Sequence, residues 1–203
     1  MKLYYSPGAC SLAAHIALCE ANVPFELVKV EGRGPKTAGG VDYMTITAKG
    51  YVPALQLDSG EVLTEGTAIL PYVGDLSPAS GLAPAAGTMA RYRLHEWLGY
   101  INSEVHKSFS PFFTPGATDE QKTAARSVLD RRLKFIEQHL AHSEYLLEGG
   151  FSVADCYLFT VLGWCRYIKI DVASNWPGLV SYLEKISARP AVHRAMQAEG
   201  LRK

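Results

Sequence analysis

The sequence lacks the features that mark zinc-binding, secreted and membrane proteins. Its four cysteines form no C-x-x-C pair, so neither a zinc site nor a dithiol motif is visible. No apolar run is long enough to span a membrane, and no basic-then-apolar signal pattern opens the chain. We therefore expect no metal and no membrane partner. Because unpaired cysteines persist in reducing compartments, we expect a cytoplasmic protein.

An excess of charge of one sign is also missing. Twenty lysine and arginine residues balance twenty aspartate and glutamate residues, so the formal net charge is +0. Nucleic acids and anionic membranes favour proteins with surplus positive charge, so the sequence predicts neither as a partner. With 203 residues, 48% of them hydrophobic, the chain can bury a sizeable core in one large or two small domains.

The first eleven residues, MKLYYSPGACS, are the most informative segment. Leu3 and Tyr5 alternate as in a strand, a Ser-Pro-Gly turn follows, and an apolar-periodic helix starts near Ser11. Helix N-termini carry unpaired N–H groups and positive dipole ends, so a thiolate at Cys10 would be stabilised and its pKa lowered. Sulfur chemistry is therefore one hypothesis. The alternative is that Ser11 only caps the helix and Cys10 only fills space.

Strands and helices alternate in the rest of the first part. We expect strands at 25–31, 52–58 and 61–65, a loop at 32–40, and a helix at 67–76. A stretch rich in Pro, Ala, Ser and Gly at 76–87 looks like a linker. The expected domains are an α/β domain at 1–80, a linker at 81–87 and a second domain at 88–203.

Helical periodicity dominates the second part. An apolar stripe predicts a helix over 89–105, and capping-box patterns at Thr118 and Ser152 open two further helices. The helix after Ser152 is apolar on all sides, so we place it at the centre of a bundle. Its one acidic residue, Asp155, is expected to be structural together with Ser152. A last helix is expected at 179–188, with a short helical tail.

Joint motifs give the chain its resemblance to a known family. Val52-Pro53 before a hairpin, TEGTAI at 64–69, GGFSVADCYL around Ser152 and ARPAVHRAM near the end are similar to cytosolic glutathione transferases. The combination of Tyr5, Cys10 and Ser11 with EVHK at 104–107 resembles the bacterial beta class. The resemblance covers nearly the whole chain. It implies a thioredoxin-like N-terminal domain followed by an all-α helical C-terminal domain, assembled as a homodimer.

The resemblance also implies a binding site for glutathione. If the Val52-Pro53 bond is cis, as the resemblance implies, the backbone N–H and C=O of Val52 would face outward and pair with the cysteinyl part of glutathione. Glu65 and Gly66, at a helix start, suit the γ-glutamyl ammonium and carboxylate. Further candidate binding residues are Lys36 or Arg33 for the glycyl carboxylate, and Asn102, Ser103 and Lys107. Ordinary alternatives stay open: a simple turn, a helix-start carboxylate and solvated charges.

Four residues are candidates for catalysis: Cys10, His106, Tyr5 and Ser11. His106 lies beside the apolar stripe, four residues after Asn102, where a donor could stabilise a thiolate or relay a proton. A lone histidine is more often structural, but the surrounding EVHK pattern favours the functional interpretation. An apolar second-substrate pocket or plain core packing would use Met44, Tyr51, Phe109, Phe112 and Phe113.

Our first hypothesis is that the protein is an enzyme, namely a glutathione transferase that acts in detoxification. It would join the glutathione thiolate to small hydrophobic electrophiles, with glutathione as co-substrate and no cofactor. The alternatives are a glutathione-dependent disulfide or peroxide reductase that uses Cys10, and a non-catalytic binding member of the fold.

Two residues depart from the pattern of the family. Gly99 replaces an asparagine that often reaches the partner's glutathione, and Pro71 lies inside a predicted helix, which it would kink or shorten. The aromatic Tyr92, Trp97 and Tyr100 favour a homodimer.

Overall fold

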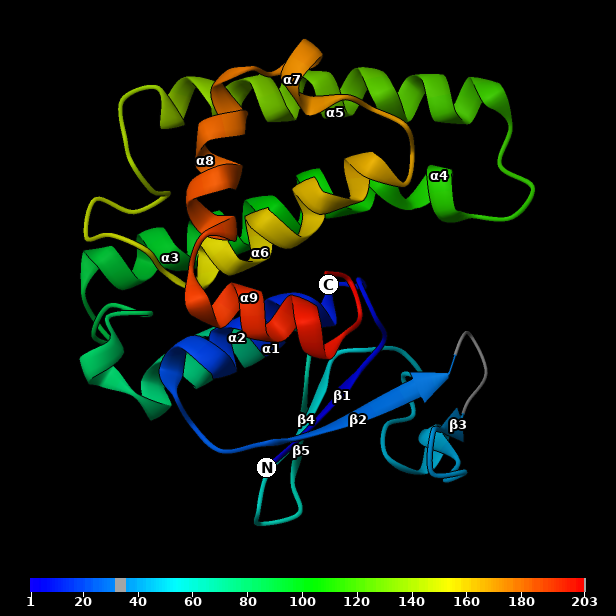
Figure 1. Cartoon of the computed structure of the whole chain (residues 1–203), viewed down its shortest axis with the longest axis vertical. Helices are drawn as coiled ribbons and strands as arrows, with labels where there is room; N and C mark the ends of the chain where they lie inside the picture. The colour runs from blue at the N-terminus through cyan, green and yellow to red at the C-terminus, as the bar shows by residue number, and fades with distance from the viewer. Residues whose placement is uncertain (32–35, 203) are drawn as a thin grey trace.

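A five-stranded mixed sheet forms the base of the molecule (Figure 1). The computed structural model describes residues 1–31 and 36–202. The strands lie in the order β3-β2-β1-β4-β5. Their bounds are Lys2–Tyr5 (β1), Glu26–Glu31 (β2), Lys36–Thr37 (β3), Ala54–Gln56 (β4) and Val62–Thr64 (β5). β1 and β2 are parallel, whereas β4 is antiparallel to both β1 and β5.

Two helices cover the sheet on the side that faces the rest of the chain (Figure 1). They are α1 (Ser11–Ala21) and α2 (Gly66–Leu76). The predicted order of strand, helix, strand, hairpin and helix is confirmed. The predicted strand 52–58 is too long, because Pro53 has no N–H to donate to a ladder, so β4 begins only at Ala54. Pro71 is buried inside α2, which nevertheless runs over 11 residues and is not shortened.

The second part is helical throughout, as predicted. Its α-helices are α3 (Met89–Tyr100), α4 (Ser110–Phe113), α5 (Asp119–Leu140), α6 (Val153–Leu162), α7 (Val172–Asn175), α8 (Gly178–Ser187) and α9 (Pro190–Ala198). Short 3₁₀ turns occur at Tyr43–Thr45, Pro78–Ser80, His106–Phe109 and Gly163–Arg166. All ten residues of α6 are buried, so its predicted place at the centre of the bundle is confirmed.

Both predicted capping boxes are present, at the starts of α5 and α6. At the second, the buried carboxylate of Asp155 accepts hydrogen bonds from the Ser152 N–H (2.9 Å), the Leu146 N–H (3.0 Å) and the Tyr182 hydroxyl (3.0 Å). The Ser152 hydroxyl lies 3.0 Å from the same carboxylate. Asp155 therefore joins the loop before α6 to α8, which extends the role expected for a helix cap.

The helix predicted over 89–105 is present, but it is a regular α-helix only as far as Tyr100. α3 ends at Tyr100, a π-helical turn follows at Ile101–Val105, and a 3₁₀ turn begins at His106. The Ser103 hydroxyl donates to the Gly99 carbonyl (3.0 Å), so a side chain competes there for a backbone acceptor. Irregular turns of this kind are frequent at functional sites. This one carries several of the candidate residues.

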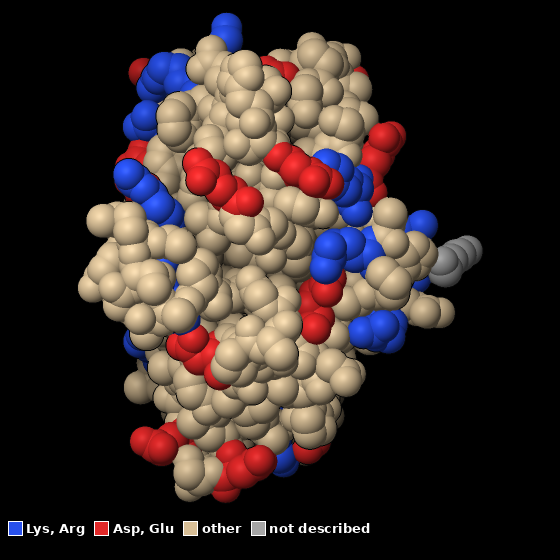
Figure 2. All heavy atoms as spheres, turned by 90° about the vertical axis from the view of Figure 1, so that its left-hand side faces the viewer, with Lys and Arg blue, Asp and Glu red and all other residues tan. Residues whose placement is uncertain are grey.

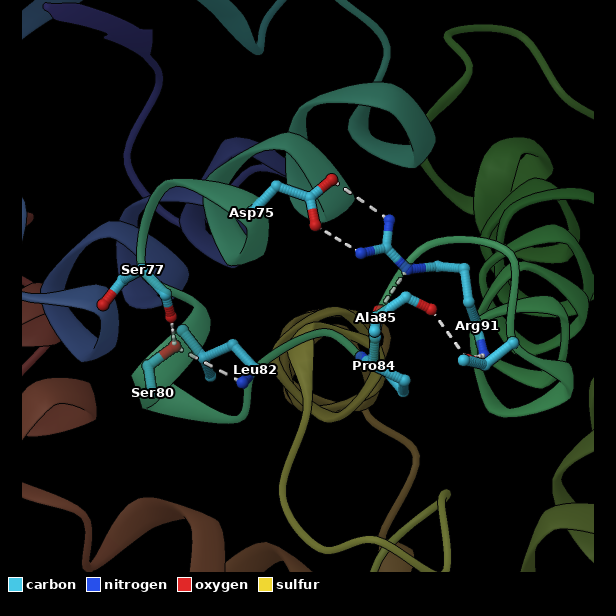
Figure 3. A network of polar contacts seen from close by, with 8 residues as sticks. Asp75, Ser77, Ser80, Leu82, Pro84, Ala85 and Arg91 are labelled. Atoms are coloured by element: carbon cyan, nitrogen blue, oxygen red, sulfur yellow. Dashed lines mark hydrogen bonds and ion pairs between the residues drawn. The ribbon is translucent and has the colours of Figure 1, made fainter.

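The sheet part and the helical part share one hydrophobic core. It includes Leu12 and Ile16 of α1 together with Leu158 of α6 and Val192 of α9. The linker is also fixed to both parts (Figure 3). Arg91 of α3 donates from Nε to the Pro84 carbonyl (2.6 Å) and pairs through its guanidinium with Asp75 of α2.

The face turned to the viewer in Figure 2 carries charged side chains of both signs, scattered among uncharged ones, with no large patch of one sign. Within residues 1–31 and 36–202, no helix combines the length and the apolar character needed to cross a membrane.

Candidate functional site

Two cavities meet at Cys10 and His106. The first, here called the α2-side cavity, has a volume of about 270 Å³. Its lining is Cys10, Ala13, Ala14, Tyr51, Val52, Pro53, Glu65, Gly66, Leu70, Asn102, His106, Lys107 and Tyr157. The second, the α4-side cavity, has a volume of about 470 Å³. Its lining is Pro7, Gly8, Ala9, Cys10, His106, Phe109, Ser110, Phe113, Thr114, Trp164 and Tyr167. One cavity is rich in charged and polar groups, and the other in aromatic rings.

Cys10 stands at the N-terminus of α1, as the sequence indicates. Its thiol donates to the Val52 carbonyl at 3.4 Å. Burial raises the pKa of Cys10 to about 11, although the backbone N–H groups of Cys10 and Ser11 act in the opposite direction. The predicted lowering of this pKa is therefore wrong for the free protein, because desolvation of the thiolate outweighs the helix terminus. Cys10 is a protonated thiol at neutral pH.

Ser11 and Tyr5 point away from both cavities. The Ser11 hydroxyl is fully buried, donates to the Ser6 carbonyl and accepts from the Ser6 N–H, both at 3.2 Å. The buried Tyr5 ring packs beside His15, at 6.2 Å between ring centroids. Neither residue lines either cavity. The structure therefore places neither candidate in a cavity where the sulfur of a substrate could lie. The side chain of Ser11 instead stabilises the loop before α1 through its hydrogen bonds to Ser6.

The loop before Cys10 is held from the helical part. The Gly8 N–H donates to Glu199 Oε2 at 2.8 Å, and the Trp164 indole N–H donates to the Gly8 carbonyl at 2.8 Å. Gly8 has φ +71°, a conformation in which a side chain would be strained. A Cβ there would also lie 3.0 Å from the Tyr167 hydroxyl. Both backbone groups of one peptide residue are thus fixed by side chains distant in sequence.

Glu65 is the single residue between β5 and α2. Its φ of +70° is unusual for a residue other than glycine, and such strain clusters at functional sites. Its carboxylate accepts from Lys49 Nζ (2.6 Å) and from the Tyr51 hydroxyl (3.1 Å), and these hydrogen bonds, Lys49 first, lower its pKa. The Val52-Pro53 peptide bond at the other side of the cavity is cis, as expected.

His106 sits in the wall between the two cavities. Its Nδ1 lies 2.7 Å from the Tyr157 hydroxyl, and its ring packs edge-on against Trp164 at 4.7 Å between centroids. Burial, with a smaller effect of Lys107, lowers the pKa of His106 to about 4. The imidazole is therefore neutral at physiological pH.

Other candidates divide between the site and its surroundings. Asn102 and Lys107 line the α2-side cavity, whereas Ser103 bonds its own helix and lines neither cavity. Lys36 lies in the edge strand β3, where its backbone pairs with that of Glu31 in β2, and it lines neither cavity. Arg33 lies outside the described residues. Of the apolar candidates, Phe109 and Phe113 line the α4-side cavity and Tyr51 the α2-side one, whereas Met44 and Phe112 line neither.

Sequence reasoning missed several residues of the site, namely Tyr157, Trp164, Tyr167, Lys49 and Glu199. Tyr157 reaches His106 across 51 positions of sequence, and Glu199 reaches Gly8 across 191. Local patterns report neighbours three or four residues apart on a helix, so they carry no signal for such pairs. A tyrosine hydroxyl within the largely apolar α6 is the one sign that could have indicated Tyr157.

A larger hollow, of about 970 Å³, lies on another face of the molecule. Its walls come from the linker, α3, α5 and the loop before α6, and include Trp97, Tyr100 and Phe135. Neither Cys10 nor His106 lies there. Size alone does not mark the chemical site, which we place where thiol, imidazole and carboxylate converge.

Comparisons with known proteins agree with this geometry. Family models described as "Glutathione S-transferase, N-terminal domain" and "Glutathione S-transferase, C-terminal domain" match residues 8–76 and 100–190. "Glutathione S-transferase GstA" of Escherichia coli O157:H7 is 40% identical over 100% of both chains.

Two solved structures are similar over almost the whole fold. The structure of a sphingomonad glutathione S-transferase complexed with glutathione is 51% identical, with a TM-score of 0.96, over 99% of this chain and 100% of the other. A bacterial beta class glutathione S-transferase of Sphingomonas chungbukensis is 48% identical, with the same TM-score and coverage.

Proposed function

Because the chain belongs to the glutathione S-transferase family, we propose that it joins the thiol of glutathione to small apolar electrophiles. One observation carries the proposal: a polar cavity and an aromatic cavity meet at Cys10 and His106. A charged peptide and an apolar molecule would each find a suitable surface, with their reacting atoms at the junction. Such positioning turns a reaction between two solutes into one within a single complex.

Glutathione fits the α2-side cavity with its glutamyl end at Glu65 and Gly66. The carboxylate of Glu65 suits the ammonium group, while the first N–H groups of α2 suit the adjacent carboxylate. In the free protein, the ammonium group of Lys49 donates a hydrogen bond to Glu65 Oε1. This contact is of the kind proposed between Glu65 and the ammonium group of glutathione. The geometry of the site therefore matches a zwitterionic amino-acid end.

The remaining parts of the peptide follow from this orientation. The backbone of Val52 suits the cysteinyl unit, in the manner of an added strand. Lys107 lines the same cavity and is our candidate for the glycyl carboxylate in place of Lys36, while Asn102 offers an amide beside it. The cysteinyl sulfur of glutathione would then lie near the Cys10 thiol, which donates a hydrogen bond to the Val52 carbonyl in the free protein.

The electrophile is proposed to enter the α4-side cavity. Phe109, Phe113 and Trp164 form its aromatic walls, with the rings of Phe109 and Trp164 at 5.5 Å between centroids. Planar, apolar molecules pack well against such rings. We therefore expect aromatic electrophiles to react better than small aliphatic ones.

A direct test is the rate of conjugation with 1-chloro-2,4-dinitrobenzene. We expect saturation with both substrates, and a raised KM for the arene alone in Phe113→Ala. A Glu65→Gln variant should raise the KM for glutathione alone. A rate equal to the uncatalysed one, in a folded protein that is not retained on immobilised glutathione, would reject the proposal.

A second candidate activity, disulfide reduction, is favoured by the place of Cys10 in both cavity linings. The Cys10 thiolate would attack the glutathione sulfur of a mixed disulfide, bond to that glutathione and release the substrate thiol; a second glutathione would then attack the bound glutathione sulfur, restore the Cys10 thiol and leave as glutathione disulfide. Assays of both reactions in Cys10→Ala separate the two activities, because only the reduction needs the attacking sulfur.

We propose a homodimer built on the outer face of α3 and α5. Exposed apolar side chains gather there: Met89, Tyr92 and Phe135 are 69%, 60% and 50% exposed. The large hollow beside Trp97 lies on the same face. Sedimentation at micromolar concentration should give twice the chain mass of 22.2 kDa. The four free cysteines support a reducing compartment such as the cytoplasm.

A further inference from the structure

The hydroxyl of Tyr157, which lines the α2-side cavity, stands between two polar side chains. It donates to Asn102 Oδ1 at 3.0 Å, and it lies 2.7 Å from His106 Nδ1. A tyrosine hydroxyl has one proton to donate. Since that proton goes to Asn102, the bond to His106 has to run the other way. Nδ1 therefore carries the proton of the neutral imidazole and donates it to the Tyr157 oxygen.

The other ring nitrogen of His106, Nε2, is then an acceptor. Among the described residues, the one buried side-chain nitrogen or oxygen without a partner is Arg132 Nε. Nε2 of His106 receives no hydrogen bond from the described residues either, and it is not one of the buried atoms. It is therefore open to the cavities that His106 lines. The Trp164 ring packs edge-on against the imidazole and fixes its plane.

We propose that Tyr157 and Asn102 are positioning residues that keep the proton of His106 on Nδ1, so that Nε2 can take the proton of the glutathione thiol. The inference rests on the proposed function, which supplies the thiol. In the step, the S–H bond breaks, the proton moves to Nε2, and the electron pair stays on sulfur as the thiolate. The sulfur then forms the bond to the electrophile. The proton leaves to solvent when a halide departs, or returns to the product when a double bond is attacked.

The chain of hydrogen bonds also suits the imidazolium that this transfer creates. Nδ1–H keeps its acceptor in the Tyr157 oxygen, and Nε2–H becomes a donor to the thiolate. With the opposite direction, Asn102 to Tyr157 to Nδ1, the nitrogen facing the sulfur would already hold a proton and could accept none. A wrong tautomer of a catalytic histidine disables a base whose place is otherwise correct.

Burial, together with the nearby charge of Lys107, keeps the imidazole of His106 neutral in the free protein. Its pKa is lowered to about 4 by burial first and by Lys107 second. The titratable groups that share its two cavities are Cys10, Tyr51, Glu65, Lys107, Tyr157 and Tyr167. Glu65 and the carboxylates of bound glutathione oppose Lys107, so substrate binding should favour the protonated imidazole.

Nitrogen NMR of ¹⁵N-histidine-labelled protein tests the tautomer without substrate. The His106 signals are identified by their loss in His106→Gln. We expect a protonated Nδ1 and an unprotonated Nε2 at neutral pH. An Asn102→Asp variant keeps the acceptor and the tautomer, whereas Asn102→Ala frees the Tyr157 proton for Nδ1 and shifts the population towards Nε2–H. A protonated Nε2 in the unmodified protein, or no shift in Asn102→Ala, would overturn the proposal.

Kinetics supply the second readout. General bases contribute about 10²- to 10⁴-fold, and we expect Tyr157→Phe to lower kcat by about 10²-fold with little change in the KM for glutathione. It should also shift the pH profile of kcat. The matched control is Tyr100→Phe, which removes a hydroxyl bonded to the Arg132 carbonyl outside both cavities and should leave kcat unchanged. An unaltered kcat and pH profile in a folded Tyr157→Phe protein would contradict the role. The tautomer is measured on free protein, so its failure leaves the transferase proposal standing.

Discussion

Glu199, near the C-terminus, is bonded to His15 in α1 at 2.9 Å, and both side chains are almost completely buried. The second carboxylate oxygen of Glu199 accepts from Gly8 in the loop before Cys10. One residue of the last turn therefore holds both the first helix and the loop that presents the thiol. The pair lies outside both cavities, so its expected effect is on stability and loop position.

We expect Glu199→Ala to destabilise the protein by about 3 kcal/mol, because it leaves buried donors without acceptors. Glu199→Gln should cost less, since an amide oxygen still accepts one of the two hydrogen bonds. Urea unfolding of the two variants measures the difference. Equal stability of Glu199→Ala and the unmodified protein would show that this contact contributes little.

Glu65→Gln should raise the KM for glutathione about tenfold while kcat changes little. A hydrogen bond to a charged group contributes about 1.5–3 kcal/mol, and 1.4 kcal/mol corresponds to a factor of ten. The proposed contact lies at the amino-acid end of glutathione, so it acts equally before and during the reaction. Initial rates over a range of glutathione concentrations provide the measurement. An unchanged KM would remove Glu65 from the site.

The protein should become less stable as pH falls, and part of this loss should depend on His106. Its pKa is lowered to about 4 in the folded protein, from an ordinary value of 6.5. Between these values the unfolded chain binds a proton that the folded protein does not, so stability is lost as pH falls from about 6.5 to about 4. The loss attributable to this group approaches about 3 kcal/mol. Urea midpoints from pH 7 to 4 should converge between the unmodified protein and His106→Asn. Parallel curves would contradict the assignment.

Cys10 should react slowly with iodoacetamide in the free protein. A pKa of about 11, against an ordinary 9.0, means about a hundredfold less thiolate at neutral pH. Mass spectrometry of the peptide that contains Cys10, with free cysteine as the reference, gives the rate. Fast alkylation at neutral pH would restore the lowered pKa that the sequence predicted. Conjugation should survive in Cys10→Ala, because the glutathione sulfur is the nucleophile.

Asp155→Ala should reduce stability by more than the roughly 1 kcal/mol of a helix cap, because several buried donors lose their acceptor. Thermal unfolding is the measurement, and Thr118→Ala at the exposed capping box of α5 is the comparison. An Asp155→Ala protein with an unchanged melting temperature and no turnover would assign Asp155 a catalytic role instead.

The sequence predicts the elements better than it predicts the site. Capping boxes and apolar periodicity are local, so the starts of α5 and α6 and the burial of α6 follow from them. The direction in which a side chain points depends on tertiary partners. Ser11 begins the predicted helix but turns towards Ser6, and Lys36 lies in an edge strand.

The pKa of Cys10 shows the same limit in energetic terms. A helix N-terminus is visible in sequence, whereas the desolvation that outweighs it comes from elements far along the chain. The hydrogen bonds of His106 are similar, because Tyr157 belongs to the central helix of the bundle. Residue types at the site were therefore foreseeable, but their protonation states were not.

The shared core and the Arg91–Asp75 ion pair have a consequence for the way this molecule melts. α1 is buried against α6 and α9 as well as against α2, so neither half keeps a complete interior when the other unfolds. Independent domains give separate calorimetric transitions, whereas a cooperative unit gives one. Scanning calorimetry should show a single endotherm, with equal calorimetric and van't Hoff enthalpies at constant protein concentration once the proposed dimer is taken into account. Residues 1–80 expressed alone should not fold.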